Sequence, residues 1–394
     1  MKIHTIELKG VRIILTARSE DGRLVVLTAD LGRDELRSWR ETRSFFCPQC
    51  RSPVHLKVGD IVIPHFAHRK ASTCRTSFSE GESPQHLNGK MLLHQLLSTR
   101  SENTVLEPLL NEISQRPDLL VASDDVRIPI EFQCSTIPIP LLEERTKGYR
   151  KVGMSPIWIL LTPQKFAAIP EGVGTFQFSK FEEWFIVSTP PEGDVLLTFN
   201  PQTKTFHYFT SLMHIAGQRY IGMHYILPIS FQFFPFVRPK VPSNEDLIRY
   251  VNLYSFRRRE NLERWIMLNR KGINDPFLRS CYEMRMHPTK LPIWIGLPIS
   301  GNQAFREADF EWQLRLLHFL KRKRLSPQNV TSFNLQQFVW SFDQPSAEKV
   351  QACKKYIEFL TKKGLKNPLD KTDFSENGIL YLISERFLAN EAQN

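Results

Sequence analysis

A group of cysteines and histidines near the start of this 394-residue sequence has the composition of a metal site. Cys47-Pro-Gln-Cys50 is followed, after fourteen residues, by His65-Phe-Ala-His68. Two thiolates and two imidazoles in close pairs suit tetrahedral zinc, and four protein ligands would make the site structural rather than catalytic. We therefore predict a zinc site formed by Cys47, Cys50, His65 and His68, with His55 and Cys74 as spare candidates. The plainer alternative is a pair of buried cysteines beside two polar loop histidines.

A second group consists of carboxylates. Arg116-Pro117-Asp118 is followed, after twelve residues, by Glu131-Phe132-Gln133. Alternate side chains of a strand share a face, so a hairpin could bring Asp118 and Glu131 together, and Glu107 on the preceding strand could join them. Such a pocket of hard oxygens suits Mg²⁺ or Mn²⁺, which can bind a phosphodiester and activate water. The alternative is a sheet edge with exposed charges, but it explains poorly an acid inside the apolar run IPIEFQC.

A helix predicted over residues 84–98 adds basic groups to the carboxylates. Ser83-Pro84 supplies an N-cap followed by a proline at the first helical position. His86, Lys90 and His94 are spaced four apart and therefore share one side of this helix.

The elements that must position these groups follow from the hydrophobic pattern. Strands are predicted over 3–8, 11–16, 23–29, 104–110, 115–122, 127–134 and 156–162, the last apolar throughout like a strand buried on both faces. Helices are predicted over 33–43, 84–98, 140–152, 245–270, 303–324, 331–342 and 346–364. The result is an α+β multidomain fold with a mixed sheet at its centre. Its predicted parts are a β-rich domain over 1–80, a mixed-sheet core over 81–210, a linker over 211–243 and a helical domain over 244–394.

Composition and charge narrow the functional class. The chain is 41% hydrophobic, which excludes global disorder, and it has no apolar run long enough to span a membrane. The beginning of the sequence does not resemble a signal peptide, so we expect a cytoplasmic protein. The net charge of +11 is concentrated in residues 1–80 and 241–394, which is compatible with a polyanionic partner. Basic runs at 257–259 and 321–324, with Lys354, Lys355, Lys362, Lys363 and Lys366, could follow a DNA backbone or simply form solvated helix faces.

The order of these motifs resembles the competence protein CoiA family over roughly residues 1–365. The resemblance rests on C-P-x-C, H-F-A-H, a helix bearing H-x-x-x-K, R-P-D and E-F-Q-C-S. It implies a zinc-binding N-terminal segment, a restriction-endonuclease-like core of the PD-(D/E)XK type and a helical C-terminal region. Further matching positions are Glu82, Glu107, Glu144, Arg145, Tyr149 and Glu311-Trp312-Gln313. Arg145 and Tyr149 are similar to the Q-x-x-x-Y helix of RecB-like nucleases, with arginine in place of glutamine.

The resemblance implies a metal-dependent deoxyribonuclease that acts in genetic competence and recombination. Its substrate would be DNA, with single strands favoured, and its partners would be recombination proteins. Asp118 and Glu131 would hold Mg²⁺ or Mn²⁺ with Glu107 in support, and Gln133 would position water. Lys90 or His86 would neutralise charge or transfer a proton. The candidate substrate-binding residues are Arg116, Ser135, Arg145 and Tyr149, of which the last two could instead hold the carboxylates.

One departure from the superfamily pattern supports a rival hypothesis. The pattern ends in E-x-K, whereas this chain has Gln133 at the third position, and a neutral amide cannot offset the charge that develops in a transition state. Lys90 could supply the missing charge. Otherwise the chain is a non-catalytic DNA-binding recombination mediator on a degenerate nuclease fold. Hydrolysis requires the two carboxylates to converge in an open cleft. Carboxylates that diverge, or that are capped by arginines in a closed surface with no room for a ligand, would overturn it. A zinc-finger transcription regulator is disfavoured, because residues 69–83 do not resemble a recognition helix.

Overall fold

The computed structural model of the protein describes most of the chain in two compact units. The described residues are 13–28, 30–60, 62–68, 83–99, 103–123, 126–189, 193–234, 236, 242–292, 294–362 and 364. The first unit contains residues up to Ile169 together with Leu197–Tyr208 and Ile226–Arg238, and the second contains Pro170–Leu196, Phe209–Tyr225 and Pro239–Asn394. The predicted strand over 3–8 lies outside the described residues, as do Cys74, Glu82, Lys363 and Lys366.

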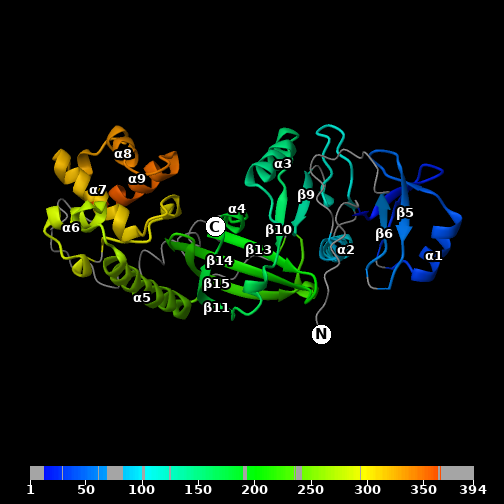
Figure 1. The fold of residues 1–394 in the computed structure, drawn as a ribbon, viewed down its shortest axis with the longest axis horizontal. Coiled ribbons are helices and arrows are strands. Elements are labelled where there is room, and N and C mark those ends of the chain that lie inside the picture. The colour runs from blue at the N-terminus through cyan, green and yellow to red at the C-terminus, as the bar shows by residue number, and fades with distance from the viewer. Residues whose placement is uncertain are drawn as a thin grey trace. The chain divides into compact units, whose positions relative to one another are not determined.

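The first unit begins with a small antiparallel sheet, coloured blue in Figure 1. Its strands are β1 (Ile13–Ile14), β2 (Thr16–Ser19), β3 (Leu24–Val26), β4 (Phe45–Phe46), β5 (Pro53–Lys57) and β6 (His65–His68), in the order β1-β6-β5-β4-β2-β3. Helix α1 (Arg33–Thr42) joins β3 to β4. On β5 the side chains alternate between exposed and buried, with Val54 and Leu56 facing the core. The described part of the N-terminal region is therefore β-rich, and residues 45–60 and 62–68 contain the three strands β4, β5 and β6.

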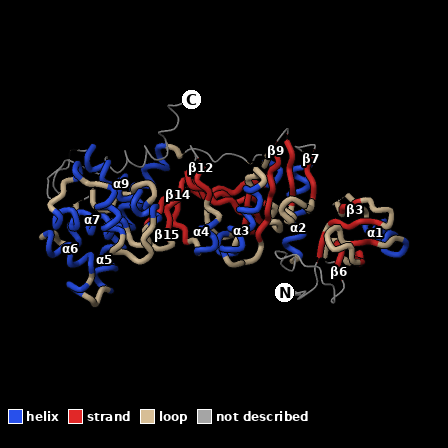
Figure 2. Tube along the Cα trace, turned by 90° about the horizontal axis from the view of Figure 1, so that it is seen from above, coloured by secondary structure: helices blue, strands red, loops and turns tan. Residues whose placement is uncertain are grey.

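A larger, nine-stranded sheet follows. Its order is β11-β15-β14-β13-β10-β9-β8-β7, with β12 paired to β13. In the first unit its strands are β7 (Asn103–Leu106), β8 (Leu119–Ser123), β9 (Val126–Gln133) and β10 (Ile157–Leu161). Strands β7, β8 and β9 are antiparallel, whereas β9 and β10 are parallel and joined through α3 (Ile139–Lys151). The predicted mixed sheet is thus confirmed, and Figure 2 shows its strands in red.

Two helices cover opposite faces of this part of the sheet. Helix α2 (Pro84–Ser98) has the predicted bounds, and the Ser83 hydroxyl accepts a hydrogen bond from His86 N as its N-cap. It crosses β9 so closely that a methyl group added at Gly89 would lie 2.0 Å from the Phe132 ring. Helix α3 instead meets Glu131, which neighbours Phe132 on the strand and therefore points to the other face. The site residues of β9 consequently face helices on both sides.

The remaining strands correct the predicted linker. They are β11 (Gly172–Gln177), β12 (Val187–Thr189), β13 (Gly193–Asn200), β14 (Thr205–Ala216) and β15 (Arg219–Pro228), with the short helix α4 (Lys180–Trp184) between the first two. The linker was predicted over 211–243, but residues 211–228 contain half of β14 and all of β15, and their side chains are largely buried. The prediction was wrong there, because the hairpin turns at Gly217 with φ of +63° and continues the sheet.

The second unit is mainly helical. Its helices are α5 (Asn244–Leu268), α6 (Pro276–Met284), α7 (Asp309–Lys323), α8 (Ser332–Val339) and α9 (Ala347–Lys362). Their core includes Met213, Ile215, Ile221 and Met223 of the last two sheet strands, so the helices do not form a separate hydrophobic core. Short 3₁₀ turns occur at Gln164–Phe166, Ile229–Phe231, Gly272–Asn274, Pro288–Lys290, Asn302–Ala304 and Pro327–Asn329. Among the described residues no helix is both long and apolar enough to cross a bilayer.

The Glu311-Trp312-Gln313 motif on α7 is part of this core. Trp312 is fully buried and stacks on Phe305 with ring centroids 4.6 Å apart. The Gln313 amide accepts hydrogen bonds from the main-chain N–H groups of Gly296 and Leu297 and donates to Leu297 O. A buried amide that satisfies three main-chain groups fixes a loop, so the motif has a structural role.

Glu311 gives a pH-dependent contribution to stability. Burial, with a further contribution from Glu307, raises its pKa to about 7. Between pH 4.5 and 7 the unfolded chain therefore ionises at this residue while the folded chain keeps its proton, and stability falls as the pH rises. We expect Glu311→Gln to be about 2–3 kcal/mol more stable than the parent at pH 8 and nearly equal at pH 4. Urea denaturation at both pH values tests this, with the exposed Glu263→Gln as control, and an equal difference at both pH values would contradict it.

Candidate functional site

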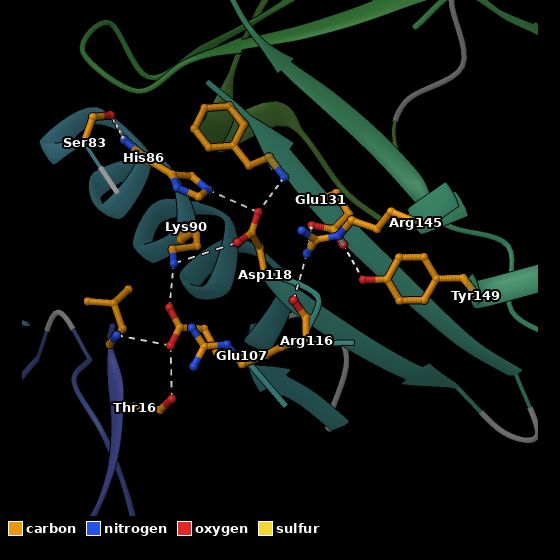
Figure 3. Close-up of polar contacts among 12 residues, drawn as sticks. Thr16, Ser83, His86, Lys90, Glu107, Arg116, Asp118, Glu131, Arg145 and Tyr149 are labelled. Carbon is orange, nitrogen blue, oxygen red and sulfur yellow. Dashed lines mark hydrogen bonds and ion pairs between the residues drawn. The ribbon is translucent and has the colours of Figure 1, made fainter. Parts of the chain in front are cut away.

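Three acidic residues lie at adjacent strand ends in the larger sheet. Glu107 directly follows β7, Asp118 directly precedes β8 and Glu131 lies within β9. Glu107 N donates to Asp118 O at 2.9 Å, which continues the pairing of β7 with β8 beyond the strand ends. Phe132 N donates to Asp118 Oδ2 at 2.8 Å and brings Asp118 beside β9. The three predicted carboxylates therefore lie at neighbouring strand ends, as Figure 3 shows, with Glu107 and Asp118 bonded to α2 and Glu131 bonded to α3.

Glu131 is held by two residues of α3. Arg145 donates from Nε to Oε1 at 2.7 Å and from Nη2 to Oε2 at 2.9 Å, and the Tyr149 hydroxyl donates to Oε1. Burial, with a contribution from the Asp118 charge, still raises the pKa of Glu131 to about 7, against the opposing effect of Arg145. Arg145 and Tyr149, four residues apart, thus hold the carboxylate, which was one of the two predicted roles.

Asp118 is oriented by α2 and by the main chain of β9. His86 Nε2 lies 3.2 Å from Asp118 Oδ2, and Lys90 Nζ lies 3.8 Å from Oδ1. Although burial alone would raise the pKa of Asp118, the charges of His86, Lys90 and Arg145 hold it well below its usual range.

Glu107 forms the third ion pair. Its Oε1 lies 2.5 Å from Lys90 Nζ, and both side chains are buried. Its Oε2 accepts from Leu15 N at 3.2 Å and from the Thr16 hydroxyl at 3.0 Å, both in the N-terminal sheet. Burial opposes ionisation, but Lys90 and then Arg116 lower the pKa of Glu107. The sequence analysis did not find Leu15 and Thr16, and no motif marks them, because they lie more than ninety residues from Glu107 along the chain.

Several predicted residues lie at the margin. The Gln133 amide donates to Ser135 O at 2.7 Å, and within the described residues it makes no hydrogen bond to the three carboxylates. Arg116 contributes its carbonyl, which accepts from Arg145 Nη2 at 2.8 Å. Ser135 is exposed. His94, the third basic residue of α2, lies 3.4 Å from the Ser98 hydroxyl.

Whether a divalent cation can bind depends on the carboxylate oxygens of Asp118 and Glu131 that still have lone pairs not used in hydrogen bonds. A carboxylate has about four lone-pair positions, and three of those of Glu131 are used, which leaves one on Oε2. Asp118 Oδ1 accepts no hydrogen bond from the described residues. The side chains of Asp118, His86 and Arg145 are 13%, 18% and 17% exposed, so the group is not sealed from solvent. The two carboxylates offer oxygen ligands of the kind that hard divalent cations take, although Arg145 caps Glu131 and Lys90 lies beside Asp118.

A second group lies in the N-terminal sheet. The ligand atoms of Cys47, Cys50 and His68 all lie within 4.8 Å of one another, and they could hold a metal ion. The turn between the cysteines is closed by Arg51 N donating to Cys47 O at 3.0 Å, with Arg51 at φ of +59°. Cys50 Sγ lies 3.5 Å from His68 Nε2.

His65 is not part of this group, which corrects the predicted ligand set. The prediction assumed a turn over H-x-x-H, but residues 65–68 form β6, and side chains three apart on a strand point to opposite faces. His65 instead bonds through Nδ1 to Ile63 O at 2.9 Å, and burial lowers its pKa. The spare candidate His55 lies on the exposed face of β5, and the other, Cys74, is outside the described residues.

The basic residues 257–259 of the second unit mainly form contacts within the protein. Arg257 pairs with Glu260 at 2.6 Å and Arg259 with Glu263 at 3.7 Å. Arg258 is largely buried and donates to Ile295 O at 2.7 Å. The run at 321–324 ends α7, where positive charge complements the helix dipole. The run at 257–259 is therefore not a continuous row of solvent-facing cations, whereas Lys321, Arg322, Lys323 and Arg324 are all exposed.

Comparison with known proteins agrees with this architecture. Three models of the competence protein CoiA match the chain, namely its N-terminal domain over residues 28–77, its nuclease-like domain over 82–238 and its C-terminal domain over 257–378. The fold and the acidic site thus define a protein with a nuclease-like domain. The chain belongs to the competence protein CoiA family. It is 28% identical over 338 residues to competence protein CoiA of Bacillus subtilis (strain 168), an alignment that covers 82% of this chain and 87% of the relative. No solved structure matches the chain.

The ion pair between Arg145 and Glu131 makes a testable contribution to folding. Arg145→Met should lower the free energy of unfolding by about 3–5 kcal/mol, because it leaves a buried acid without its cation. The double variant Arg145→Met/Glu131→Gln should recover much of this loss, since it removes both charges. Tyr149→Phe, which removes one hydrogen bond, should cost only about 1–2 kcal/mol. Urea denaturation measures all three, and an equal loss in the single and double arginine variants would be inconsistent with this account.

Proposed function

We propose that the protein is a divalent-metal-dependent DNA nuclease that acts in genetic competence and recombination. The observation that carries the proposal is the placement of Asp118 and Glu131 at neighbouring strand ends, with Asp118 beside the buried cation Lys90. Further support comes from the family match to a nuclease-like domain and from the competence protein of Bacillus subtilis to which the chain is similar. The proposed substrate is DNA in the cytoplasm, with single strands preferred and recombination proteins as partners.

Each site residue has a role in this proposal. Asp118 Oδ1 and Glu131 Oε2 would hold Mg²⁺ or Mn²⁺, which when bound supplies a Lewis acid for the phosphodiester and for water. Arg145 and Tyr149 engage both oxygens of Glu131 and so fix the orientation of its carboxylate. His86 fixes Asp118 through Oδ2. Lys90 stands in for the lysine of the E-x-K pattern and offsets negative charge on the scissile phosphate.

A cleavage assay tests the proposal. Full-length protein is incubated with single- and double-stranded DNA and Mg²⁺ or Mn²⁺, and cutting should cease when the cation is chelated. Asp118→Asn and Glu131→Gln should each lower the rate about a hundredfold or more, because each removes one anionic ligand. Glu112→Gln, at an acid on the surface of the same unit, is the matched control and should cut like the parent. Cutting that persists in both site variants would refute the assignment.

A non-catalytic DNA-binding function is the second candidate, and one observation favours it. Arg145 occupies both oxygens of Glu131, while Gln133 turns to Ser135 O and supplies no charge. A site of this kind could bind a DNA backbone without hydrolysing it. Well-folded parent protein that binds DNA in a salt-dependent manner but shows no cation-dependent cutting would support this candidate over the first.

We further propose that the N-terminal domain binds a zinc ion through Cys47, Cys50 and His68. Two thiolates and one imidazole at contact distance favour zinc over the harder divalent cations. Purified protein should contain about one Zn²⁺ per chain by elemental analysis. Cys50→Ser and His68→Ala should lose it on dialysis against a chelator, whereas His65→Gln should retain it. Loss of zinc from the His65 variant alone would contradict this ligand set.

A further inference from the structure

The contact of Glu107 with the N-terminal sheet has no role in the proposal above. Glu107 was predicted to support a metal ion, yet its carboxylate is 4% exposed and engaged by Lys90 on one oxygen and by Leu15 N and Thr16 on the other. Only one of its lone-pair positions remains, on the oxygen that Lys90 occupies. Glu107 is therefore better suited to orient Lys90 than to bind a cation.

The main chain at Glu107 supports this interpretation. Its φ of +50° lies in the left-handed region, which a residue with a long side chain adopts at an energetic cost. The conformation directs the carboxylate to a point where Lys90 Nζ and Thr16 Oγ1 both reach it, as Figure 3 shows. Thr16 is 1% exposed and Lys90 is fully buried, so solvent cannot replace either partner.

Lys90 connects this contact to the candidate site. Its Nζ lies 2.5 Å from Glu107 Oε1 and 3.8 Å from Asp118 Oδ1. A lysine side chain has four rotatable bonds, and its ammonium takes a fixed position only where acceptors hold it. Because Thr16 and Leu15 N fix Glu107, they fix the distance between the Lys90 ammonium and Asp118.

We propose that the N-terminal sheet is an integral part of the nuclease-like site, with Thr16 as a positioning residue that acts through Glu107 on Lys90. Any effect of Thr16 on DNA cleavage rests on the proposed nuclease function. The effect of Thr16 on the position of Lys90 is independent of that function. The N-terminal sheet then contributes to the geometry of the site by fixing Glu107 and, through it, Lys90.

The chemical reactivity of Lys90 tests the proposal without any cleavage assay. Full-length protein is treated with an amine-acylating reagent, and the modification of each lysine is followed by mass spectrometry. Thr16→Val, which keeps the shape of the side chain but removes the hydroxyl donor, should raise the rate at Lys90 about fivefold relative to exposed Lys147. Thr16→Ser, which keeps the donor, should restore the parent rate. Thr42→Val on α1 is the matched control and should leave Lys90 unchanged.

Two comparisons exclude a merely structural effect. Unfolding would also raise the rate at Lys349, a buried lysine of the second unit, so a selective rise at Lys90 reports on the local contact. In a Glu107→Gln background the Thr16→Val change should have little additional effect, because its path to Lys90 is already broken. If Thr16→Val fails to fold, Thr16→Ala is measured in the same way. Unchanged Lys90 reactivity in a folded variant, or a full additional effect in the Glu107→Gln background, would overturn the proposal.

Cleavage provides an independent readout if the parent protein cuts DNA. Thr16→Val should then lower kcat about tenfold with KM little changed, and Thr16→Ser should restore it, because a mispositioned ammonium affects the transition state more than binding. A parent that does not cut refutes the nuclease proposal and leaves the reactivity test in force. A parent that cuts, with unchanged reactivity at Lys90 in Thr16→Val, refutes the positioning role alone.

Discussion

The structure of the first unit depends on neutralising three buried carboxylates that lie side by side. Ionised acids removed from water repel one another strongly, and each must be offset by a cation or by hydrogen-bond donors. Arg145 of α3 pairs with the carboxylate of Glu131. From α2, His86 contacts the carboxylate of Asp118 and Lys90 pairs with that of Glu107. Because the two helices cover opposite faces of the sheet, only the layered fold brings all three cations to one strand end. The packing of α2 and α3 on the sheet is therefore what allows the three carboxylates to be buried together.

The acidic site could be predicted from the sequence where its determinants are local. The N-cap and spacing of α2, the acid within the apolar β9 and the four-residue step from Arg145 to Tyr149 all lie within single elements. The ligand role of His65 was mispredicted, because H-x-x-H has one geometry on a turn and another on a strand, and the sequence did not distinguish them. The linker was mispredicted because the segment 211–228 lacks a clear alternation of polar and apolar residues, as a strand buried on both faces does. Thr16 was beyond prediction, because its role arises from a contact between distant segments.

The contact at Glu107 also connects the N-terminal sheet to the acidic site of the nuclease-like domain. Within the N-terminal sheet, the Cys47, Cys50 and His68 group is connected to this contact through β6, whose Phe66 pairs with Ile14 directly before Leu15. His68 at the end of β6 belongs to the group with Cys47 and Cys50. A metal ion bound there would therefore rigidify the strand pair that presents Leu15 N and Thr16 to Glu107, and the two sites would be mechanically connected.

The replacement of lysine by Gln133 acquires a physical explanation from this geometry. A lysine two residues beyond the acid on a strand is positioned by the strand itself, because alternate side chains share a face. Here the Gln133 amide is bonded to Ser135 O, and the Lys90 ammonium, at the end of a flexible side chain on α2, lies 3.8 Å from Asp118 Oδ1. A lysine on a neighbouring helix lacks this constraint, so its ammonium needs a hydrogen-bond acceptor that fixes its position. In the proposed arrangement Glu107 is that acceptor, because it accepts from Lys90 on one oxygen and from Leu15 N and Thr16 on the other.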